Sequence, residues 1–584
     1  MNEPVSRLTK RALAALAASA LLAACGGEPA APPAPETVEI SLPSVPKAAV
    51  AMPDIHSARI AREVLEEGGN AVDAAVAASF ALAVTLPEAG NIGGGGFMNL
   101  FVNGETDFVD YRETAPARAE RDMYLDEAGE FVARRAQVGP LAAGTPGAVR
   151  GLAAAHEKYG SLPWRRLVEP AVALARDGFE IHEKLARSIA RKGRFYGEET
   201  NFSAYFSGEA GDVLKQPELA ETLQRIADLG PEEFYTGKTA EITAAYMEKV
   251  GGLITMEDLA AYQAVWREPI SFEWNDRTVV SAPPPSSGGI ALAQLLLMKE
   301  ALSDKFEGIE RNSSQYVHLV AEMEKRVFAD RAEYLGDPDF YDVPTERLTD
   351  PAYIARRAAE VNADVISETD DVKPGLPESF QTTHFSIVDG DGNAASVTTT
   401  LNASFGSGVV VEGAGYLLNN EMDDFSAKPG APNLYGVVGA DANAIAPGKR
   451  MLSSMTPSLV LEDGEVAMVV GTPGGPTIFT SVFQAIVNRF DYGLPVEEAV
   501  AAGRFHHQLL PRDSILFESR IRDADAVAAD LEAKGYSLRR AKNYGDVHAI
   551  TIDDGVVEAA HDPRNRGASF VFEVEAEASA AASE

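Results

Sequence analysis

The stretch QTTHFSIVDGDGNAASVTTTLN, residues 381–402, gives the clearest secondary-structure signal in the chain. Residues 383–388 and 394–400 are rich in side chains that favour strands, and they flank the turn sequence DGDGN. An Asp-Gly turn between two such runs is typical of a β-hairpin. Threonine also favours strands for packing reasons alone, so this spacing by itself assigns no chemistry to Thr382 or Thr400.

Two further hairpins are predicted downstream. Residues 458–461 and 466–470 flank Asp463-Gly464, and another strand pair surrounds Asp553-Asp554-Gly555. Between them, residues 477–490 have helical periodicity. Strands, a helix and more strands together predict an α+β architecture in which helices cover sheets.

The chain before residue 381 is predicted to be mainly helical. Residues 57–67 have helical spacing with Ser57 as a candidate N-cap, and residues 71–85 form a nearly all-apolar helix that must be buried. Further helices are predicted at residues 147–158, 165–177, 217–228, 290–301 and 313–334. Since no internal repeat or second linker interrupts this pattern, we expect one large intertwined unit.

The N-terminus predicts export and lipidation. Basic residues precede an apolar run, residues 12–24, that is too short to span a bilayer as a mature helix. The run ends LAACG and resembles the bacterial lipobox, so residues 1–24 are predicted to be a lipoprotein signal peptide and Cys25 the lipidated first residue. A generic signal peptide is the alternative. Residues 25–47 are rich in Pro and Ala and predict an extended tether.

Charge and cysteine content exclude several classes of partner. The 87 acidic and 51 basic residues give a net charge of -36, which repels nucleic acid, so no nucleic-acid partner is expected. An anionic substrate would need a local cationic anchor. Cys25 is the only cysteine, which excludes an intramolecular disulfide.

Three stretches have the composition of a site. The sequence GTPGGP, residues 471–476, leaves backbone N–H groups at a helix start, where they suit a carboxylate or an oxyanion, although a tight turn would need the same residues. The glycines of residues 93–96 fit no nucleotide-binding pattern and favour close backbone packing, and Arg112 follows them. An isolated arginine is usually a surface ion pair. The third stretch, QTTH, opens the first hairpin.

From about Ala48 to Ser569 the chain resembles the gamma-glutamyltransferase family. The matching stretches are GGNAVDAA from Gly68, GGGGFM from Gly93, RETAP from Arg112, PPPSSGG from Pro283, YLGDPD from Tyr334, QTTHFS from Gln381, LNNEMDDF from Leu418, LSSM from Leu452 and GTPGG from Gly471. A series of that length in that order is too specific for chance matches to short motifs.

The resemblance implies the N-terminal-nucleophile hydrolase fold, a four-layer αββα sandwich. It implies a precursor that cleaves itself between Gln381 and Thr382 into two intertwined subunits, residues 48–381 and 382–584, with an acidic tail from about residue 573. Thr382 would then be the nucleophile. Its freed α-amine would have a pKa of about 7.7 to 8.0, which suits the role of general base near neutral pH.

Other site residues follow from the same resemblance. It assigns the orientation of the nucleophile to Thr400 and the oxyanion hole to Gly474 and Gly475. The remaining assignments are Arg112 with Ser453 and Ser454 for the substrate carboxylate, Asn402, Glu421 and Asp424 for its α-ammonium, and Tyr435 for a lid. No cofactor or metal is implied.

The expected activity is cleavage of gamma-glutamyl amides such as glutathione, with water or an amino acid or dipeptide as acceptor. The expected location is the bacterial cell envelope, with a lipid anchor in the membrane and the enzyme facing the periplasm or exterior. Glutaryl or cephalosporin acylases of the same fold are one alternative, which the presence of Glu421 and Asp424 disfavours. A catalytically silent lipoprotein that binds peptides is another. A zinc hydrolase is disfavoured because the nine histidines have no metal-ligand spacing.

Overall fold

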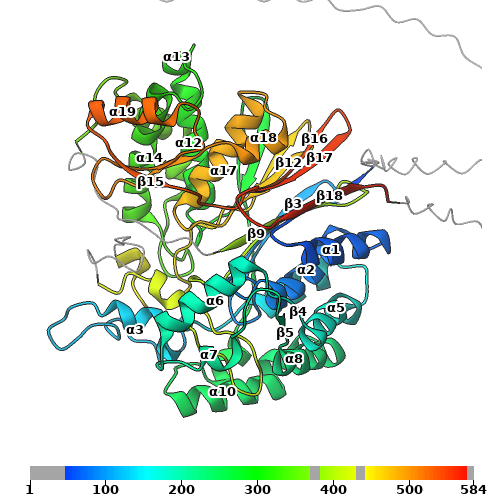
Figure 1. Cartoon of the computed structure of the whole chain (residues 1–584). Helices are drawn as coiled ribbons and strands as arrows, with labels where there is room; N and C mark the ends of the chain where they lie inside the picture. Colours follow the sequence, from blue (N-terminus) through cyan, green and yellow to red (C-terminus); the bar gives the residue numbers. More distant parts are fainter. Residues whose placement is uncertain (1–46, 369–381, 429–440, 575–584) are drawn as a thin grey trace, which may run out of the picture. The chain divides into compact units, whose positions relative to one another are not determined.

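The computed structural model describes residues 47–368, 382–428 and 441–574 (Figure 1). The predicted signal peptide, the lipidation site Cys25, the cleavage residue Gln381 and the lid residue Tyr435 lie outside these ranges. Within them, no helix has both the length and the apolar character that crossing a membrane requires.

The first layer of strands is a seven-stranded antiparallel sheet with the predicted hairpin at its centre. In order across the sheet, its strands are β18 (Ala568–Phe572), β1 (Ala48–Met52), β9 (Thr383–Val388), β10 (Ala394–Thr400), β2 (Gly95–Val102), β3 (Glu105–Asp110) and β6 (Val265–Arg267). The hairpin β9–β10 has the bounds expected from the sequence. Strands from the first 110 residues lie on both sides of it.

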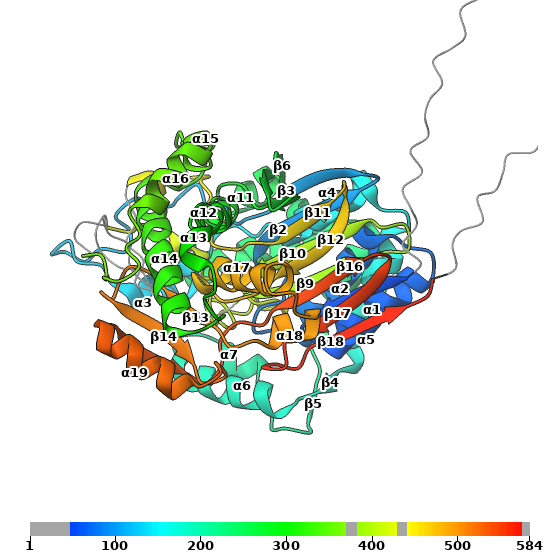
Figure 2. The same cartoon turned by 90° about the horizontal axis from the view of Figure 1, so that it is seen from above.

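The second layer is a six-stranded antiparallel sheet that packs face to face on the first. Its strands, in order, are β17 (Val556–His561), β16 (His548–Asp553), β12 (Glu465–Gly471), β11 (Ser458–Glu462), β8 (Arg277–Ser281) and β7 (Ile270–Trp274). This confirms the two predicted downstream hairpins. Figure 2 shows β12 and β16 lying over β10 and β9. An apolar cluster that includes Ala51, Val388, Leu459 and Ile550 fills the space between the sheets.

Helices cover the outer face of each sheet (Figure 1). On the seven-stranded sheet lie α1 (Ile55–Glu66), α2 (Ala71–Thr85) and α4 (Ala148–Tyr159), with α5 (Trp164–Asp177) and α8 (Pro217–Leu229) packed behind α2. On the six-stranded sheet lie α12 (Gly288–Ala301), α17 (Thr477–Phe490) and α18 (Val496–Ala501), with α14 (Ser314–Tyr334) beside α12. The predicted four-layer αββα sandwich is confirmed.

The remaining elements lie outside these two sheets and their main helices. They are α3 (Ala133–Gln137), α6 (Glu183–Tyr196), α7 (Phe202–Tyr205), α9 (Glu232–Thr236), α10 (Lys238–Val250), α11 (Met256–Ala261), α13 (Ser303–Phe306), α15 (Thr345–Leu348), α16 (Pro351–Ala359), α19 (Ala524–Lys534), β4 (Phe179–Glu180), β5 (Val213–Leu214), β13 (Phe505–His507), β14 (Ser514–Glu518), β15 (Ser537–Ala541), and the 3-10 turns η1 (Pro140–Ala142), η2 (Glu421–Asp424) and η3 (Asp441–Asn443).

The first two helices show how local sequence sets their ends. Every residue of α2 is buried, as its apolar composition predicts, and Asn70 closes a capping box with Asp73 at its start. The prediction that Ser57 caps α1 is wrong. Asp54 is the N-cap, because its extended backbone lets Oδ1 accept a hydrogen bond from the Ser57 N–H at 2.7 Å.

Strand β2 begins within the run of four glycines. A Cβ at Gly96 would lie 2.5 Å from the carbonyl oxygen of Thr398 on β10, so only glycine permits this approach of the two backbones. The prediction of close backbone packing at these glycines is therefore confirmed. The strand itself was not predicted, because glycine has a low strand propensity.

Candidate active site

Thr382 lies at the end of the seven-stranded sheet, one residue before β9, and is half-buried. Thr383 on β9 pairs with Thr399 on β10, so Thr400 extends one residue beyond that pair on the same side as Thr382. The Thr400 hydroxyl oxygen accepts a hydrogen bond from the Asn402 backbone N–H at 2.7 Å. The hairpin therefore brings together the predicted nucleophile and the residue predicted to orient it.

The loop from Gly471 to Thr477 connects β12 to α17. Gly474 and Gly475 have φ values of 144° and 56°, and a Cβ on Gly474 would lie 2.4 Å from the Thr477 hydroxyl. Both carbonyl groups accept hydrogen bonds from the start of α17. Within the described ranges, the N–H groups of these two glycines have no acceptor, which suits a site for developing negative charge.

Contacts between the two sheets fix where this loop lies. The carbonyl oxygen of Val470 accepts a hydrogen bond from Ser396, which pairs with Ser386 on β9. One residue further along β12, Gly471 packs against the ring of His384, where a Cβ would lie 2.3 Å from the ring. Successive residues of β12 thus approach the N-terminal end of β9. The loop that follows Gly471 therefore begins beside the start of β9, the strand that Thr382 precedes.

Arg112 is a buried cation of the site, with 1% of its surface exposed. Its Nη1 lies 2.6 Å from Oε2 of Glu421, and its Nη2 lies 2.5 Å from Oδ2 of Asp424. The guanidinium also donates to the carbonyl oxygens of Met451 at 3.3 Å and Leu452 at 3.2 Å. The structure therefore joins three sequence-predicted residues in one ion-pair cluster.

Burial dominates the protonation of the carboxylates around Arg112. It raises the pKa of Glu421 to about 8, although Arg112 opposes the rise, and it raises the pKa of Glu113 to about 7. The nearby polar groups of Asp424 and Thr400 also counter part of the rise in the pKa of Glu421. Burial by itself lowers the pKa of Arg112, but the attraction of Glu421, Glu113 and Asp424 outweighs it and raises that pKa. Arg112 remains charged at every working pH.

The Thr400 hydroxyl lies close enough to Glu421 to lower its pKa, so the two halves of the site are adjacent. Asn402, which bonds to Thr400 through its backbone, donates from Nδ2 to the carbonyl oxygen of Asn420 at 2.9 Å. Asn402 has a φ of 69°, a left-handed conformation that asparagine tolerates better than most residues. The predicted ammonium-binding residues thus lie between the nucleophile end of the sheet and Arg112.

Ser453 and Ser454 directly follow the two carbonyls that bind Arg112. The Ser453 hydroxyl accepts a hydrogen bond from the Met455 N–H at 3.1 Å and so keeps its own hydrogen to donate. The Ser454 hydroxyl accepts one from Nη2 of Arg331 at 3.0 Å. This arrangement fits the expected role of the two serines as supporting hydrogen-bond donors.

Two residues of this region were not predicted as site residues. Glu113 lies 3.5 Å from Arg112, and among the described residues neither of its carboxylate oxygens has a hydrogen-bond partner. Arg331 reaches from α14 to Ser454 and Ser287. The position of Glu113 directly after Arg112 in the sequence could have identified it as a site residue. Arg331 gave none, because a charged residue on a helix normally indicates a solvated face.

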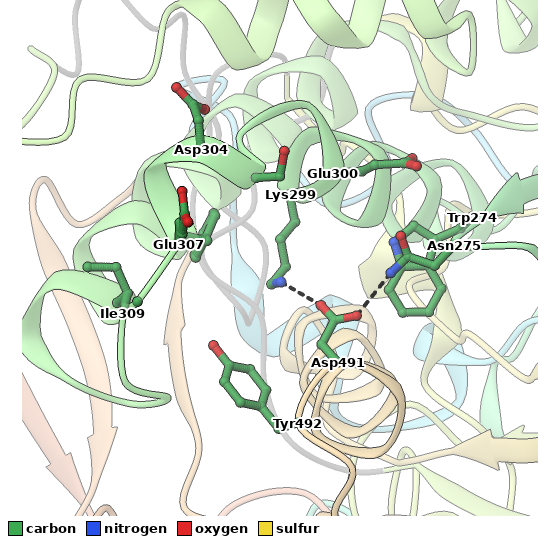
Figure 3. Close-up of a pocket in the computed structure, with 12 residues that line it drawn as sticks. Trp274, Asn275, Lys299, Glu300, Asp304, Glu307, Ile309, Asp491 and Tyr492 are labelled. Carbon is green, nitrogen blue, oxygen red and sulfur yellow. Dashed lines mark hydrogen bonds and ion pairs between the residues drawn. The ribbon is translucent and has the colours of Figure 1, made fainter.

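A cavity of about 690 Å³ lies elsewhere, beside α12, α13 and the end of α17 (Figure 3). In it, Asp491 accepts a hydrogen bond from Asn275 at 3.0 Å and pairs with Lys299 at 2.5 Å. Phe306 and Tyr492 add aromatic walls. None of the sequence-predicted site residues lines it. In the part of the chain that the structure covers, no group of three acidic, His or Cys side chains is arranged to hold a metal ion.

The sandwich, together with a threonine at the start of a central strand, defines an N-terminal-nucleophile hydrolase. The sequence profile of the family described as Gamma-glutamyltranspeptidase matches residues 57–572. A glutathione hydrolase proenzyme of Pseudomonas aeruginosa is 57% identical over 525 residues, covering 90% of this chain and 94% of that protein. The chain belongs to the gamma-glutamyltranspeptidase family.

Solved structures agree with this assignment. A gamma-glutamyltranspeptidase from Pseudomonas nitroreducens, complexed with L-DON, is 54% identical with a TM-score of 0.55, and the match covers 55% of this chain and 96% of that one. A cephalosporin acylase from Bacillus halodurans gives a TM-score of 0.78 over 92% of this chain and 98% of that one. At 24% identity, the acylase shows a shared fold only.

The raised pKa of Glu421 predicts proton release when an α-ammonium binds. At pH 7 a carboxyl with a pKa of about 8 is mostly protonated, and a neighbouring cation favours its ionised form. Binding of L-glutamate at pH 7 should therefore release up to about 0.9 proton. Calorimetry in buffers of different ionisation enthalpy measures this number, which should fall close to zero in Glu421→Gln. Equal release by both proteins would show that another group titrates.

Proposed function

We infer that this protein is a gamma-glutamyl hydrolase and transferase that cleaves gamma-glutamyl amides such as glutathione through an ester on Thr382. The observation that carries this inference is the Arg112–Glu421–Asp424 cluster beside the strand end that bears Thr382. A gamma-glutamyl group carries one carboxylate and one ammonium on the same carbon. A cation flanked by two acids matches that pair of charges.

Self-cleavage creates the catalytic base. In the precursor, the Thr382 hydroxyl attacks the carbonyl carbon of Gln381, and the chain passes through an ester that water then hydrolyses. Cleavage frees the α-amine of Thr382. An α-amine has a pKa of about 7.7 to 8.0, which makes it a suitable proton acceptor near neutral pH. Family membership and the proenzyme name of the relative from Pseudomonas aeruginosa support this step.

Acyl transfer then follows on the same hydroxyl. The α-amine of Thr382 takes the hydroxyl proton as the oxygen attacks the gamma-carbonyl, and the N–H groups of Gly474 and Gly475 stabilise the oxyanion. The leaving amine takes the proton as the tetrahedral intermediate collapses to the ester. Water, or the amine of an amino acid or dipeptide, then attacks that ester and gives a proton to the α-amine of Thr382. The bond from the acyl carbon to the Thr382 oxygen breaks, and that oxygen takes the proton back and becomes a hydroxyl again. One oxyanion donor contributes about 2.7 to 4 kcal/mol to such a transition state.

Recognition relies on opposite charges. Arg112, with Ser453 and Ser454, would bind the substrate carboxylate, while Asp424, Glu421 and Asn402 would bind its ammonium. In the structure Glu421 and Asp424 both lie against Arg112, so each substrate charge replaces part of an existing polar contact rather than entering an uncompensated environment. Tyr435 is proposed as a lid residue and lies outside the described residues.

Thr382→Ala should abolish both activity and cleavage. Active wild-type protein should contain two chains, with the smaller one beginning at Thr382, because only cleavage produces the α-amine. The variant should remain a single inactive chain. Gel electrophoresis, N-terminal sequencing and assay with glutathione test this, with Thr383→Ala, the neighbouring residue, as the matched control. Uncut wild-type protein with full activity would refute the mechanism.

Asp424→Asn should separate this function from that of a glutaryl acylase. The variant should lose about 10-fold to 100-fold in kcat/KM for a gamma-glutamyl amide, because the substrate ammonium loses a charged partner. A glutaryl amide has no ammonium, so its kcat/KM should change by less than about threefold. An equal loss with both substrates would assign Asp424 a structural role through Arg112 and favour the acylase alternative.

We also propose that the mature protein is a processed heterodimer held on the cell envelope by lipidated Cys25, facing the periplasm or exterior. The support is the lipobox-like sequence and the short apolar run before it. Mass spectrometry of membrane-extracted protein should find acyl groups on an N-terminal Cys25, and Cys25→Ala should move active enzyme to the soluble fraction. An unmodified Cys25 would leave a secreted enzyme.

A further inference from the structure

Thr472 connects the glycine loop to a second segment of chain. Its hydroxyl is fully buried, accepts a hydrogen bond from the Asp546 N–H at 2.9 Å, and donates one to the carbonyl oxygen of Pro473 at 2.9 Å. Pro473 directly precedes Gly474. The hydroxyl thus ties the segment around Asp546 to the backbone that carries the two glycine N–H groups.

The same segment contacts the strand that bears the nucleophile. His548 begins β16 and pairs in register with Gly471, and its carbonyl oxygen accepts a hydrogen bond from the Ser386 hydroxyl of β9 at 3.1 Å. Residues 546–548 therefore touch the glycine loop at one end and the Thr382 strand at the other. Any shift of this segment changes the position of the loop relative to Thr382.

One buried ion pair and its hydrogen bonds to the backbone hold the segment in place. Arg504 donates to the carbonyl oxygen of Tyr544 at 3.0 Å and pairs with Asp562 at 2.5 Å, and Asp562 accepts the Val547 N–H at 3.0 Å. Gly545 has a φ of 71°, and a Cβ there would lie 2.9 Å from Arg504 and 3.2 Å from the Thr472 hydroxyl. The segment is thus fixed on both sides of its contact with Thr472.

We propose that Thr472 is a positioning residue that fixes the N–H groups of Gly474 and Gly475 at the oxyanion formed on Thr382. The proposal rests on the proposed function. An oxyanion hole acts through donors that are already in place when charge develops, and an error of about 1 Å in their position can reduce the rate about 100-fold. Thr472 does not touch the reacting atoms and acts only through the loop.

Thr472→Val removes the hydroxyl and keeps the shape of the side chain. Its kcat for a gamma-glutamyl amide, normalised to the two-chain form, should fall about 10-fold to 100-fold, while KM changes less than about threefold. Thr472→Ser keeps the hydroxyl and should restore kcat to within about threefold of wild type. Thr480→Val, a fully buried threonine on α17 outside the loop, is the matched control and should leave kcat unchanged.

A tetrahedral ligand separates positioning from general stability. A boronic acid analogue of the gamma-glutamyl group forms a tetrahedral adduct on a hydroxyl nucleophile, with an oxygen where the oxyanion would be. Its affinity for Thr472→Val should weaken by about the same factor as kcat, whereas the affinity for L-glutamate should not change. Equal kcat in the valine and serine variants, or equal weakening of both ligands, would overturn the proposal.

Failure of the Thr472→Val variant to mature is distinguished from failure of the proposed function. If Thr472→Val does not reach the two-chain form, Thr472→Cys carries the same test, because a thiol is a poor hydrogen-bond acceptor of similar size, and its kcat should fall below that of the serine variant. A cysteine variant as active as the serine variant would overturn the proposal. If wild-type protein itself does not turn over gamma-glutamyl amides, the proposed function fails instead.

Discussion

The burial of one positive charge constrains the arrangement around the site. Removing a guanidinium from water costs several kcal/mol unless charged and polar partners surround it. The partners of Arg112 come from three separate parts of the chain: Glu113 beside it, Glu421 and Asp424 on η2, and the carbonyls of residues 451–452. The fold must bring these segments together for the charge to be tolerated. The same requirement places the predicted binding residues around a common point.

Local signals predicted the elements around the nucleophile well. The turn sequence DGDGN set the ends of β9 and β10, and the apolar run with Asn70 before it set the bounds of α2. Their order in the sheet was beyond local signals. The pairing of β9 with β1, more than 330 residues earlier in the chain, depends on which faces bury apolar surface together, and no turn connects them.

Site residues within the family's motifs could be predicted from the sequence. Charged residues that the fold buries could not, because the sequence alone does not show whether a charged side chain is buried or solvated. Arg112 and Thr382 followed from the resemblance to a family. Glu113 and Arg331 did not, because charged residues beside other charges usually indicate solvent. Helix α14 buries Glu322, Glu324 and Arg331, and periodicity cannot distinguish such a helix face from a solvated one.

The interleaved sheet has a consequence for the cleaved protein. Strands β9 and β10 lie after the proposed cleavage point between Gln381 and Thr382, whereas their neighbours β1 and β2 lie before it. Before cleavage, all four strands assemble within one molecule, at a rate that does not depend on concentration. After cleavage, reassembly becomes a bimolecular reaction of two incomplete chains, each with exposed strand edges that favour aggregation. The lifetime of the mature enzyme at high temperature is then set by its rate of unfolding. Heat inactivation of the cleaved enzyme is therefore irreversible, whereas the single-chain precursor can refold.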